Sequence, residues 1–317
     1  MKRVLVTGAT GFVGSALVAR LAGTDGYVPV AVTRRPFAFP DGVETIQVGD
    51  LSELASKLSG IDTVVHCAAR VHVMRGEAAD PPAAFRKDNV EATLRLAEDA
   101  ARAGVRRFVF LSSIKASGEE TLAKPFTEET EPRPETPYGQ SKLEAEEGLR
   151  AIASRTSLEV VRIRPPLVYA AHAGGNFARL LRWLCRGLPL PLGSVVNSRS
   201  YVALENLVDV IVRCIDHPGA ANELFLVSDG EDLSTPDMLR AIAGGMDKEA
   251  VLLPFPVPLI RIAAAMLGQK DAARQVCGLL VLDSRKVREM LAWQPPLTAR
   301  DALRAAGAAF AGRQTTG

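Results

Sequence analysis

Close to its start the chain reads Thr7-Gly8-Ala9-Thr10-Gly11-Phe12-Val13-Gly14. The apolar run Val4-Leu5-Val6 before this stretch predicts a buried strand, and a helical pattern follows it. Glycines at such a turn let the backbone approach a pyrophosphate, whose charge the free N–H groups and dipole of a helix N-terminus stabilise. The GxxGxxG spacing therefore predicts a dinucleotide site at the first helix. Its predicted residues are Gly8, Gly11, Phe12, Val13 and Gly14.

Outward from this turn, short β-branched segments alternate with helical patterns. Strands are predicted at residues 4–7, 28–33, 44–48, 63–66, 107–111 and 159–164. Strict alternation of strand and helix implies right-handed parallel crossovers. We therefore expect an α/β fold with a doubly wound parallel Rossmann sheet and a smaller C-terminal substrate-binding region.

The alternation of strands and helices is interrupted after Arg164, because Pro165-Pro166 ends the strand and turn-rich segments follow. Residues 201–204, 207–215 and 224–227 again read as strand, helix and strand. We predict a dinucleotide-binding domain over residues 1–168, to which residues 199–230 return. Residues 169–198 and 231–317 then form the smaller region, with helices near 176–186, 235–244, 283–291 and 298–309.

Composition and charge exclude several classes of protein. The 317 residues carry a net charge of +2, with Lys and Arg scattered among Asp and Glu, so no basic stripe predicts binding to nucleic acid or an anionic membrane. The apolar stretch 251–267 is interrupted by three prolines and Arg261, which argues against membrane insertion. The start of the chain lacks a signal-peptide pattern, so we expect a cytoplasmic protein. Metal binding is not expected, because the four cysteines lie far apart.

The end of the second predicted strand reads Val32-Thr33-Arg34-Arg35, and no acid follows before Asp41. A carboxylate here would favour NAD, whereas Arg pairs well with a ribose phosphate. Thr33, Arg34 and Arg35 therefore favour NADP, with NAD and a solvated basic loop as the alternatives. Asp50-Leu51 follows the third strand, where it would contact adenine or cap a helix.

Tyr138 and Lys142 lie four residues apart in a predicted helix that Thr136 caps. On one helix face they form a candidate acid/base pair, in which the ammonium lowers the phenol pKa and holds the nicotinamide ribose. Ser113 follows the strand 107–111 at the carboxyl edge of the sheet, where α/β folds bind ligands. A chance Tyr–Lys spacing and a simple turn at Ser113 are the alternatives.

Together, the glycine motif, Ser113 and Tyr138-Gly139-Gln140-Ser141-Lys142 resemble the extended short-chain dehydrogenase/reductases, the NAD-dependent epimerase/dehydratase family of nucleotide-sugar enzymes. The segments 64–69 and 164–169 also resemble that family. The resemblance implies that Ser113, Tyr138 and Lys142 are catalytic. It implies cofactor contacts from Ala68, Ala69, Asn89, Tyr138, Lys142 and Pro165, and substrate contacts from Ser113, Asn176, Arg199 and Arg274. For Arg199 and Arg274 a plain surface role is the alternative.

The resemblance also narrows the reaction. Dehydratases of the family carry an Asp-Glu pair where this chain has Ile114 and Lys115, so dehydration is not expected. The leading hypothesis is a 4-ketoreductase that acts on a UDP-4-keto-6-deoxy-N-acetylhexosamine in surface polysaccharide biosynthesis. The alternatives are a UDP-hexose 4-epimerase with tightly bound NAD and a non-catalytic NADP-binding sensor. A homodimer formed through helices near residues 89–103 and 138–153 is expected, because two-fold dimers are the commonest oligomers.

Overall fold

The computed structural model describes residues 1–71 and 80–315. Seven parallel strands form the main sheet in the order β3-β2-β1-β4-β5-β6-β9. Their bounds are β1 Lys2–Thr7, β2 Tyr27–Thr33, β3 Glu44–Gln47, β4 Thr63–His66, β5 Arg107–Leu111, β6 Glu159–Arg164 and β9 Leu224–Leu226. The predicted doubly wound α/β Rossmann sheet is therefore confirmed.

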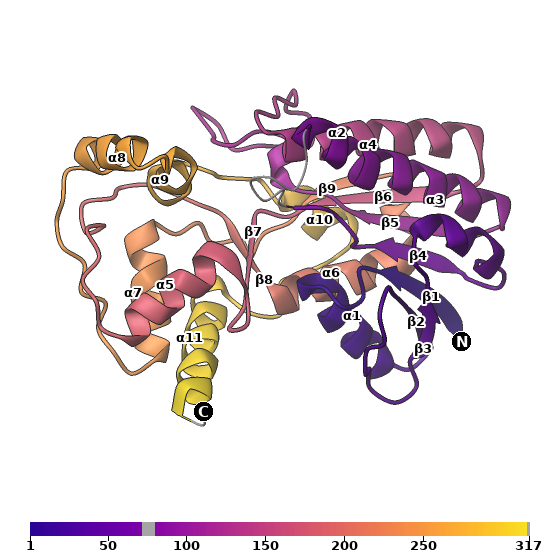
Figure 1. Ribbon diagram of the computed structural model, residues 1–317, viewed down its shortest axis with the longest axis horizontal. Helices are drawn as coiled ribbons and strands as arrows, with labels where there is room; N and C mark the ends of the chain where they lie inside the picture. Colours follow the sequence, from indigo (N-terminus) through magenta and orange to yellow (C-terminus); the bar gives the residue numbers. More distant parts are fainter. Residues whose placement is uncertain (72–79, 316–317) are drawn as a thin grey trace.

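Helices cover both faces of this sheet, which explains why its strands are nearly continuous apolar runs. On one face lie α1 (Phe12–Ala22) and α6 (Leu204–Asp216), and on the other lie η1 (Leu51–Lys57), α3 (Ala92–Arg102) and α4 (Pro137–Arg155) (Figure 1). Along β1, Val4 and Val6 pack into the first layer and Leu5 packs into the second. The carboxyl ends of all these strands meet at one edge of the sheet.

Residues after β6 build a second, smaller core. Strands β7 (Leu167–Tyr169) and β8 (Tyr201–Ala203) pair with each other in a separate two-stranded sheet. The helices of this part are α5 Gly175–Cys185, α7 Thr235–Gly245, α8 Val257–Met266, α9 Lys270–Cys277 and α11 Ala299–Thr315. Helix α10 Arg285–Met290 packs instead on the core of the large sheet through Val287. The last two residues of the predicted smaller region, 316 and 317, lie outside the described residues.

Within residues 199–230, which are predicted to return to the dinucleotide-binding domain, strand β8 does not join the large sheet. Strand β6 ends because Pro165 and Pro166 follow it, and the next strand, β7, lies outside the large sheet. Strand β8 pairs with β7. Leu204 already belongs to α6, which packs against the sheet, and β9 then pairs with β6.

Short helical segments complete the chain: α2 Pro81–Phe85, the π-helical η2 Arg86–Glu91, η3 Ile114–Ala116 and η4 Pro218–Ala220. Among the described residues, no helix combines the length and the apolar character needed to cross a membrane. Part of the apolar stretch 251–267 folds as α8.

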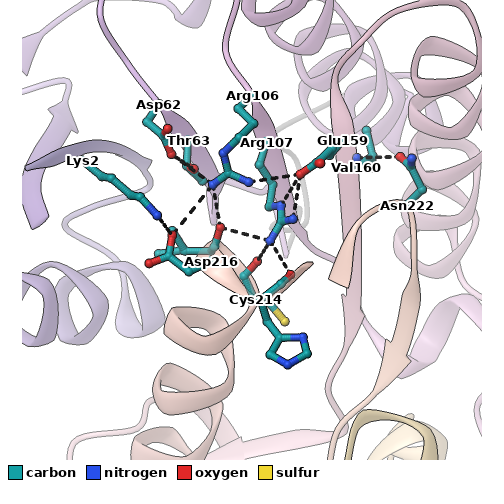
Figure 2. Close-up of polar contacts among 12 residues, drawn as sticks. Lys2, Asp62, Thr63, Arg106, Arg107, Glu159, Val160, Cys214, Asp216 and Asn222 are labelled. Carbon is teal, nitrogen blue, oxygen red and sulfur yellow. Dashed lines mark hydrogen bonds and ion pairs between the residues drawn. The ribbon is translucent and has the colours of Figure 1, made fainter. Parts of the chain in front are cut away.

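Two arginines at the start of β5 join the amino edge of the sheet to α6 (Figure 2). Arg107 is buried, and its Nε donates to the Glu159 carboxylate at 2.8 Å. Its Nη1 donates to carbonyl oxygens at the carboxyl end of α6, those of Cys214, Ile215 and His217. Arg106 forms ion pairs with Asp62 and Glu159. A cation at a helix carboxyl end is electrostatically favourable, so this network holds α6 on the sheet.

Candidate active site

The glycine turn between β1 and α1 has little room for side chains. Gly8 has a φ of +67°, and a Cβ there would lie 2.7 Å from the Ala68 backbone nitrogen. A Cβ on Gly14 would lie 2.1 Å from the Gly8 carbonyl oxygen. Gly11 precedes α1, whose N-terminus has no side-chain cap among the described residues, and Phe12 and Val13 are its first residues. Open N–H groups on a close-approaching backbone fit a pyrophosphate.

Substitution at Gly14 should weaken dinucleotide binding. In Gly14→Ala the new methyl group meets backbone, so the turn must shift at a cost of about 1–3 kcal/mol. We expect the dissociation constant of the dinucleotide to rise roughly tenfold or more, as measured by fluorescence titration. The matched control is Gly23→Ala at the other end of α1, where a Cβ would have its nearest neighbour at 3.7 Å. Equal affinities in the two variants would contradict the role of the turn.

The end of β2 supplies the next set of predicted cofactor residues. The Thr33 hydroxyl is buried and has no hydrogen-bond partner among the described residues. Arg34 and Arg35 are exposed, and neither forms an ion pair within residues 1–71 and 80–315. A buried hydroxyl without a partner beside two open cations is consistent with a polar, anionic group binding there.

Asp50 caps a helix, the second of its predicted roles. Its carboxylate accepts from the Ser52 N–H at 3.0 Å, and Glu53 accepts from the Asp50 N–H, which completes a capping box at the start of η1. Hydrogen bonds from Ser52 lower the pKa of Asp50, and the Arg95 and Arg34 guanidinium groups add to this. Leu51 is the first residue of η1.

A buried hydrogen-bond chain fixes the loop after β4, which carries Ala68 and Ala69. The Thr93 hydroxyl donates to the Asn89 carbonyl at 2.7 Å, so it accepts from Nε2 of His66, 2.9 Å away. Nδ1 of His66 then accepts from the Thr7 hydroxyl at 2.7 Å. Burial lowers the pKa of His66 to about 3, so the ring is neutral. The chain therefore ties the strand before the glycine turn to α3.

Asn89 was predicted to contact the cofactor, but its amide is engaged within the protein. The amide nitrogen donates to the Arg70 carbonyl and to the Ser141 hydroxyl, and the amide oxygen accepts from the Arg70 N–H at 2.8 Å. Asn89 thus joins the loop after β4 to α4. This long-range use of a buried amide has no signature in local sequence.

The structure brings Ser113, Tyr138 and Lys142 together at the carboxyl edge of β5. Thr136 caps α4 by accepting from the Gly139 N–H, and this places Tyr138 and Lys142 one turn apart on the helix. The Ser113 side chain hydrogen-bonds to the Tyr138 phenol. Nζ of Lys142 is buried and donates to the Leu111 carbonyl at 2.8 Å.

Pro165, another predicted cofactor residue, is hydrogen-bonded to the turn that carries Ser113. It is buried after β6, and its carbonyl accepts from the Ile114 N–H at 3.0 Å. The residue after Ser113 is therefore held to the end of the neighbouring strand.

The pKa of Tyr138 differs from the value that the sequence predicts. Burial raises the pKa of Tyr138 to about 12, with the hydrogen bond from Ser113 acting in the opposite direction. The prediction that the Lys142 ammonium lowers the phenol pKa is wrong for this arrangement, because that ammonium is bonded to the Leu111 carbonyl. Burial lowers the pKa of Lys142 itself to about 8, against the influence of Cys67 and Glu146. The phenol is thus a proton donor near neutrality.

Turnover should fall as the pH rises through about 8, where Lys142 titrates. The lysine is charged below its pKa and neutral above it, so any step that needs the ammonium is lost on the alkaline side. The measurement is the pH dependence of kcat. In Glu146→Gln, which removes a negative charge that raises the Lys142 pKa, the decline should begin at lower pH. An alkaline limb unmoved by Glu146→Gln would contradict the assignment to Lys142.

Sequence reasoning missed a buried ion pair beneath the site. Arg164 Nε and Nη2 donate to the two oxygens of the Glu146 carboxylate at 2.9 and 2.7 Å, and both side chains are buried. Ser112 also donates to Glu146, while Nη1 of Arg164 donates to the Ser117 hydroxyl. The pair therefore holds both ends of the turn that carries Ser113. The sequence held one indirect signal. Glu146 lies four residues after Lys142, so both are on the same face of the predicted helix.

The predicted substrate residues gather around α9. Arg199 is 6% exposed, and its guanidinium donates to the Gly278 carbonyl just beyond α9 at 3.0 Å. Asn176 at the start of α5 donates to Gln275 of α9 at 3.1 Å. Arg274 of α9 forms an ion pair with Glu135 at 2.7 Å, on the segment that leads into α4. Burial lowers the pKa of Arg199, which has no ion pair within the part of the chain that the structure describes.

Known proteins resemble the chain over nearly its whole length. A family model described as "NAD dependent epimerase/dehydratase family" matches residues 4–227. A UDP-glucose 4-epimerase of Vibrio cholerae is 43% identical over 314 residues, covering 98% of this chain and 95% of the relative. A GDP-6-deoxy-D-mannose reductase of Pseudomonas aeruginosa is 27% identical, covering 96% and 95%. The solved structure of MoeE5 in complex with UDP-glucose and NAD superimposes with a TM-score of 0.78, at 27% identity, with 99% of each chain covered.

Proposed function

Since the chain belongs to the NAD-dependent epimerase/dehydratase family, we propose that it is a UDP-hexose 4-epimerase. It is an NAD(P)-dependent enzyme of the extended short-chain dehydrogenase/reductase type, from a family of nucleotide-sugar 4-epimerases and reductases. The 43% identity to a UDP-glucose 4-epimerase over 98% of the chain carries the proposal. It favours the epimerase, the sequence-based alternative, over the 4-ketoreductase that was the leading hypothesis, and it sets the non-catalytic sensor aside.

The site residues are suited to removing and returning hydrogen at C4 of a sugar. The glycine turn, Thr33 and the Ala68-Ala69 loop would hold the dinucleotide, which when bound supplies reversible removal and return of hydride at C4 of the sugar. The Ser113 hydroxyl would donate a hydrogen bond to O4, and the Tyr138 phenol would exchange the O4 proton. Taking that proton requires the phenolate, which the hydrogen bond from Ser113 favours, while the Lys142 ammonium would hold the nicotinamide ribose.

Direct assay on UDP-sugars tests the proposal. We expect purified protein to interconvert UDP-glucose and UDP-galactose, or the corresponding N-acetylhexosamine pair, with no added reductant, followed by NMR of the sugar H1 signals. Product without net oxidation of a cofactor supports epimerisation. Stoichiometric NADPH consumption with a UDP-4-keto-6-deoxy sugar, and no interconversion of UDP-hexoses, would overturn it.

The 4-ketoreductase stays a second candidate because of the end of β2. Arg34 and Arg35 are exposed there and no acid lies between Thr33 and Asp41, which favours a cofactor with a ribose phosphate. A reductase exchanges its NADPH at each turnover, whereas an epimerase keeps its dinucleotide. The reductase from Pseudomonas aeruginosa, at 27% identity, agrees with this second candidate.

Cofactor preference should depend on Arg34. In Arg34→Asp a carboxylate replaces a guanidinium, so we expect the affinity for NADPH relative to NADH to fall roughly tenfold or more. The ratio of the two dissociation constants measures this. Arg304→Asp on α11 is the matched control, because it makes the same charge change on an exposed helix position. An unchanged ratio in Arg34→Asp would refute the phosphate role.

Two further properties are proposed on the sequence evidence. A homodimer would form through α3 and α4, the helices of the predicted ranges 89–103 and 138–153, because two-fold dimers are the commonest oligomers. Sedimentation velocity would establish the oligomeric state. A cytoplasmic location agrees with soluble nucleotide sugars as substrates and would be checked by cell fractionation.

A further inference from the structure

The first turn of α4 carries Tyr138, and its geometry depends on support from outside the helix. The leading N–H groups of an α-helix have no intrahelical acceptor, so the start of a helix is fixed by its cap. In α4 the Gly139 N–H donates to the Thr136 hydroxyl at 3.2 Å. Tyr138 lies between these two residues, so the position of its side chain follows from the geometry of the cap. A group that fixes the Thr136 hydroxyl therefore also fixes Tyr138.

Glu119 is the group that fixes the Thr136 hydroxyl. Its side chain is 8% exposed, and its Oε1 accepts from that hydroxyl at 3.0 Å. A hydroxyl has one proton to donate and lone pairs with which to accept. Because Thr136 donates its proton to Glu119, a lone pair of the same oxygen is left for the Gly139 N–H. The carboxylate thus orients the cap as an acceptor for the helix.

Lys115 holds the second oxygen of the Glu119 carboxylate. Its Nζ lies 3.0 Å from Oε2 of Glu119. Arg274, the nearby cation on α9, forms its ion pairs with Glu120 and Glu135. Within residues 1–71 and 80–315, Lys115 is therefore the ion-pair partner of Glu119. Since Lys115 belongs to η3, the ion pair links the turn after β5 to the start of α4.

Backbone packing joins the same turn and the same helix. A Cβ on Gly139 would lie 2.5 Å from the Lys115 carbonyl oxygen, so η3 and α4 touch there without an intervening side chain. Within η3 the Lys115 N–H donates to the Ser113 hydroxyl at 3.3 Å. The two hydroxyls of the site, those of Ser113 and Tyr138, lie on the two sides of this contact. A small shift of α4 would separate them, and shifts of about 1 Å can slow a reaction roughly a hundredfold.

We propose that Glu119 is a positioning residue for Tyr138 and acts through the Thr136 cap. The Lys115 ammonium holds the carboxylate in place from the side of η3. This inference rests on the proposed function, in which Tyr138 exchanges the O4 proton of the sugar. Loss of the carboxylate should slow the chemical step and leave the binding of both ligands unchanged, because it disturbs the geometry of proton transfer alone.

A double-mutant cycle between Glu119 and Thr136 tests the proposal. We expect Glu119→Ala to lower kcat roughly tenfold, with KM and the dinucleotide dissociation constant changed by less than about twofold. Thr136→Ala should cause a similar loss. The double variant should lose no more than either single variant, because both substitutions act on one cap. Glu119→Gln keeps an oxygen that accepts from Thr136, so its kcat should stay within about threefold of that of the unmodified enzyme.

Glu131→Ala is the matched control. It removes a carboxylate from the same loop, at a side chain that is 77% exposed and pairs with Arg133 on the surface. Its kcat should equal that of the unmodified enzyme. Hydrogen exchange of the Gly139 amide, followed by NMR, needs no sugar. Glu119→Ala should accelerate this exchange roughly tenfold, and Glu131→Ala should not.

Three results would overturn the proposal. The first is a double variant whose loss is the product of the two single losses, because Glu119 would then not act through the cap. The second is an equal loss of kcat in Glu119→Gln and Glu119→Ala, and the third is unchanged exchange at Gly139 in Glu119→Ala. If the protein reduces a 4-keto sugar in place of interconverting UDP-hexoses, the cycle is measured on that reduction. The exchange result and the proposed reaction therefore fail separately.

Discussion

Tyr138→Phe is expected to lower kcat roughly a thousandfold, the usual scale for loss of a general acid or base. The phenol is the group that hydrogen-bonds Ser113, whereas the other hydroxyl on that turn of α4, that of Ser141, donates to the Tyr138 carbonyl. The ring itself stays, together with its edge contact to Phe85, so the fold and the dinucleotide affinity should change little. Steady-state kinetics with the UDP-sugar and fluorescence titration of the dinucleotide measure the two properties separately.

Tyr27→Phe is the matched control for this experiment. Tyr27 lies at the amino edge of the sheet, where its hydroxyl donates to Asp216 at 2.8 Å, so this substitution removes a phenol hydroxyl and its hydrogen bond far from Ser113. Its kcat should equal that of the unmodified enzyme. Activity retained in Tyr138→Phe would mean that another group exchanges the proton at the sugar.

Glu146→Ala should lower the free energy of unfolding by about 3–5 kcal/mol, as expected when one member of a buried ion pair is removed. Arg164 would keep its charge in the interior, where the Ser117 hydroxyl is its one remaining side-chain partner among the described residues, and Ser112 would lose its acceptor. Urea denaturation measures the loss. The turn that carries Ser113 should loosen as well, which predicts a lower kcat at temperatures where the variant is folded.

The neighbouring residue provides the control. Glu147→Ala makes the same chemical change one position along α4 at an exposed side chain, where the unfolding free energy should change by less than about 0.5 kcal/mol. Equal destabilisation by the two substitutions would show that the ion pair is not what stabilises this part of the core.

The large sheet was predictable because its signal is local and repetitive. The bounds of β4, β5 and β6 agree with the predicted ranges 63–66, 107–111 and 159–164. Parallel connectivity then placed the ends of these strands at one edge, so the meeting of Ser113 with Tyr138 followed from topology. The glycine turn was equally local.

What escaped prediction depends on contacts between distant segments. The strand at 201–203 has the same pattern whether it joins the large sheet or pairs with β7, and only the exit of the chain at Pro165 decides between them. The Glu146–Arg164 ion pair and the internal bonding of Asn89 require burial that no local pattern reports. Helix α8 has an apolar composition that a core helix would share, so the exposure of Leu259, Ile262 and Met266 is visible only in the fold.

The carbonyl acceptors of Arg107 have a consequence for biosynthesis. That arginine enters the sheet with β5, but the acceptors at the end of α6 follow it by about a third of the chain, at 214–217. While the ribosome is making the intervening residues, the guanidinium and the face of β1 that α6 covers remain without their partners. A fragment that ends after β6 should therefore be a poor autonomous folding unit. The nascent protein completes its nucleotide domain only after β7, α5 and β8, which lie between β6 and α6 in the chain, have been synthesised.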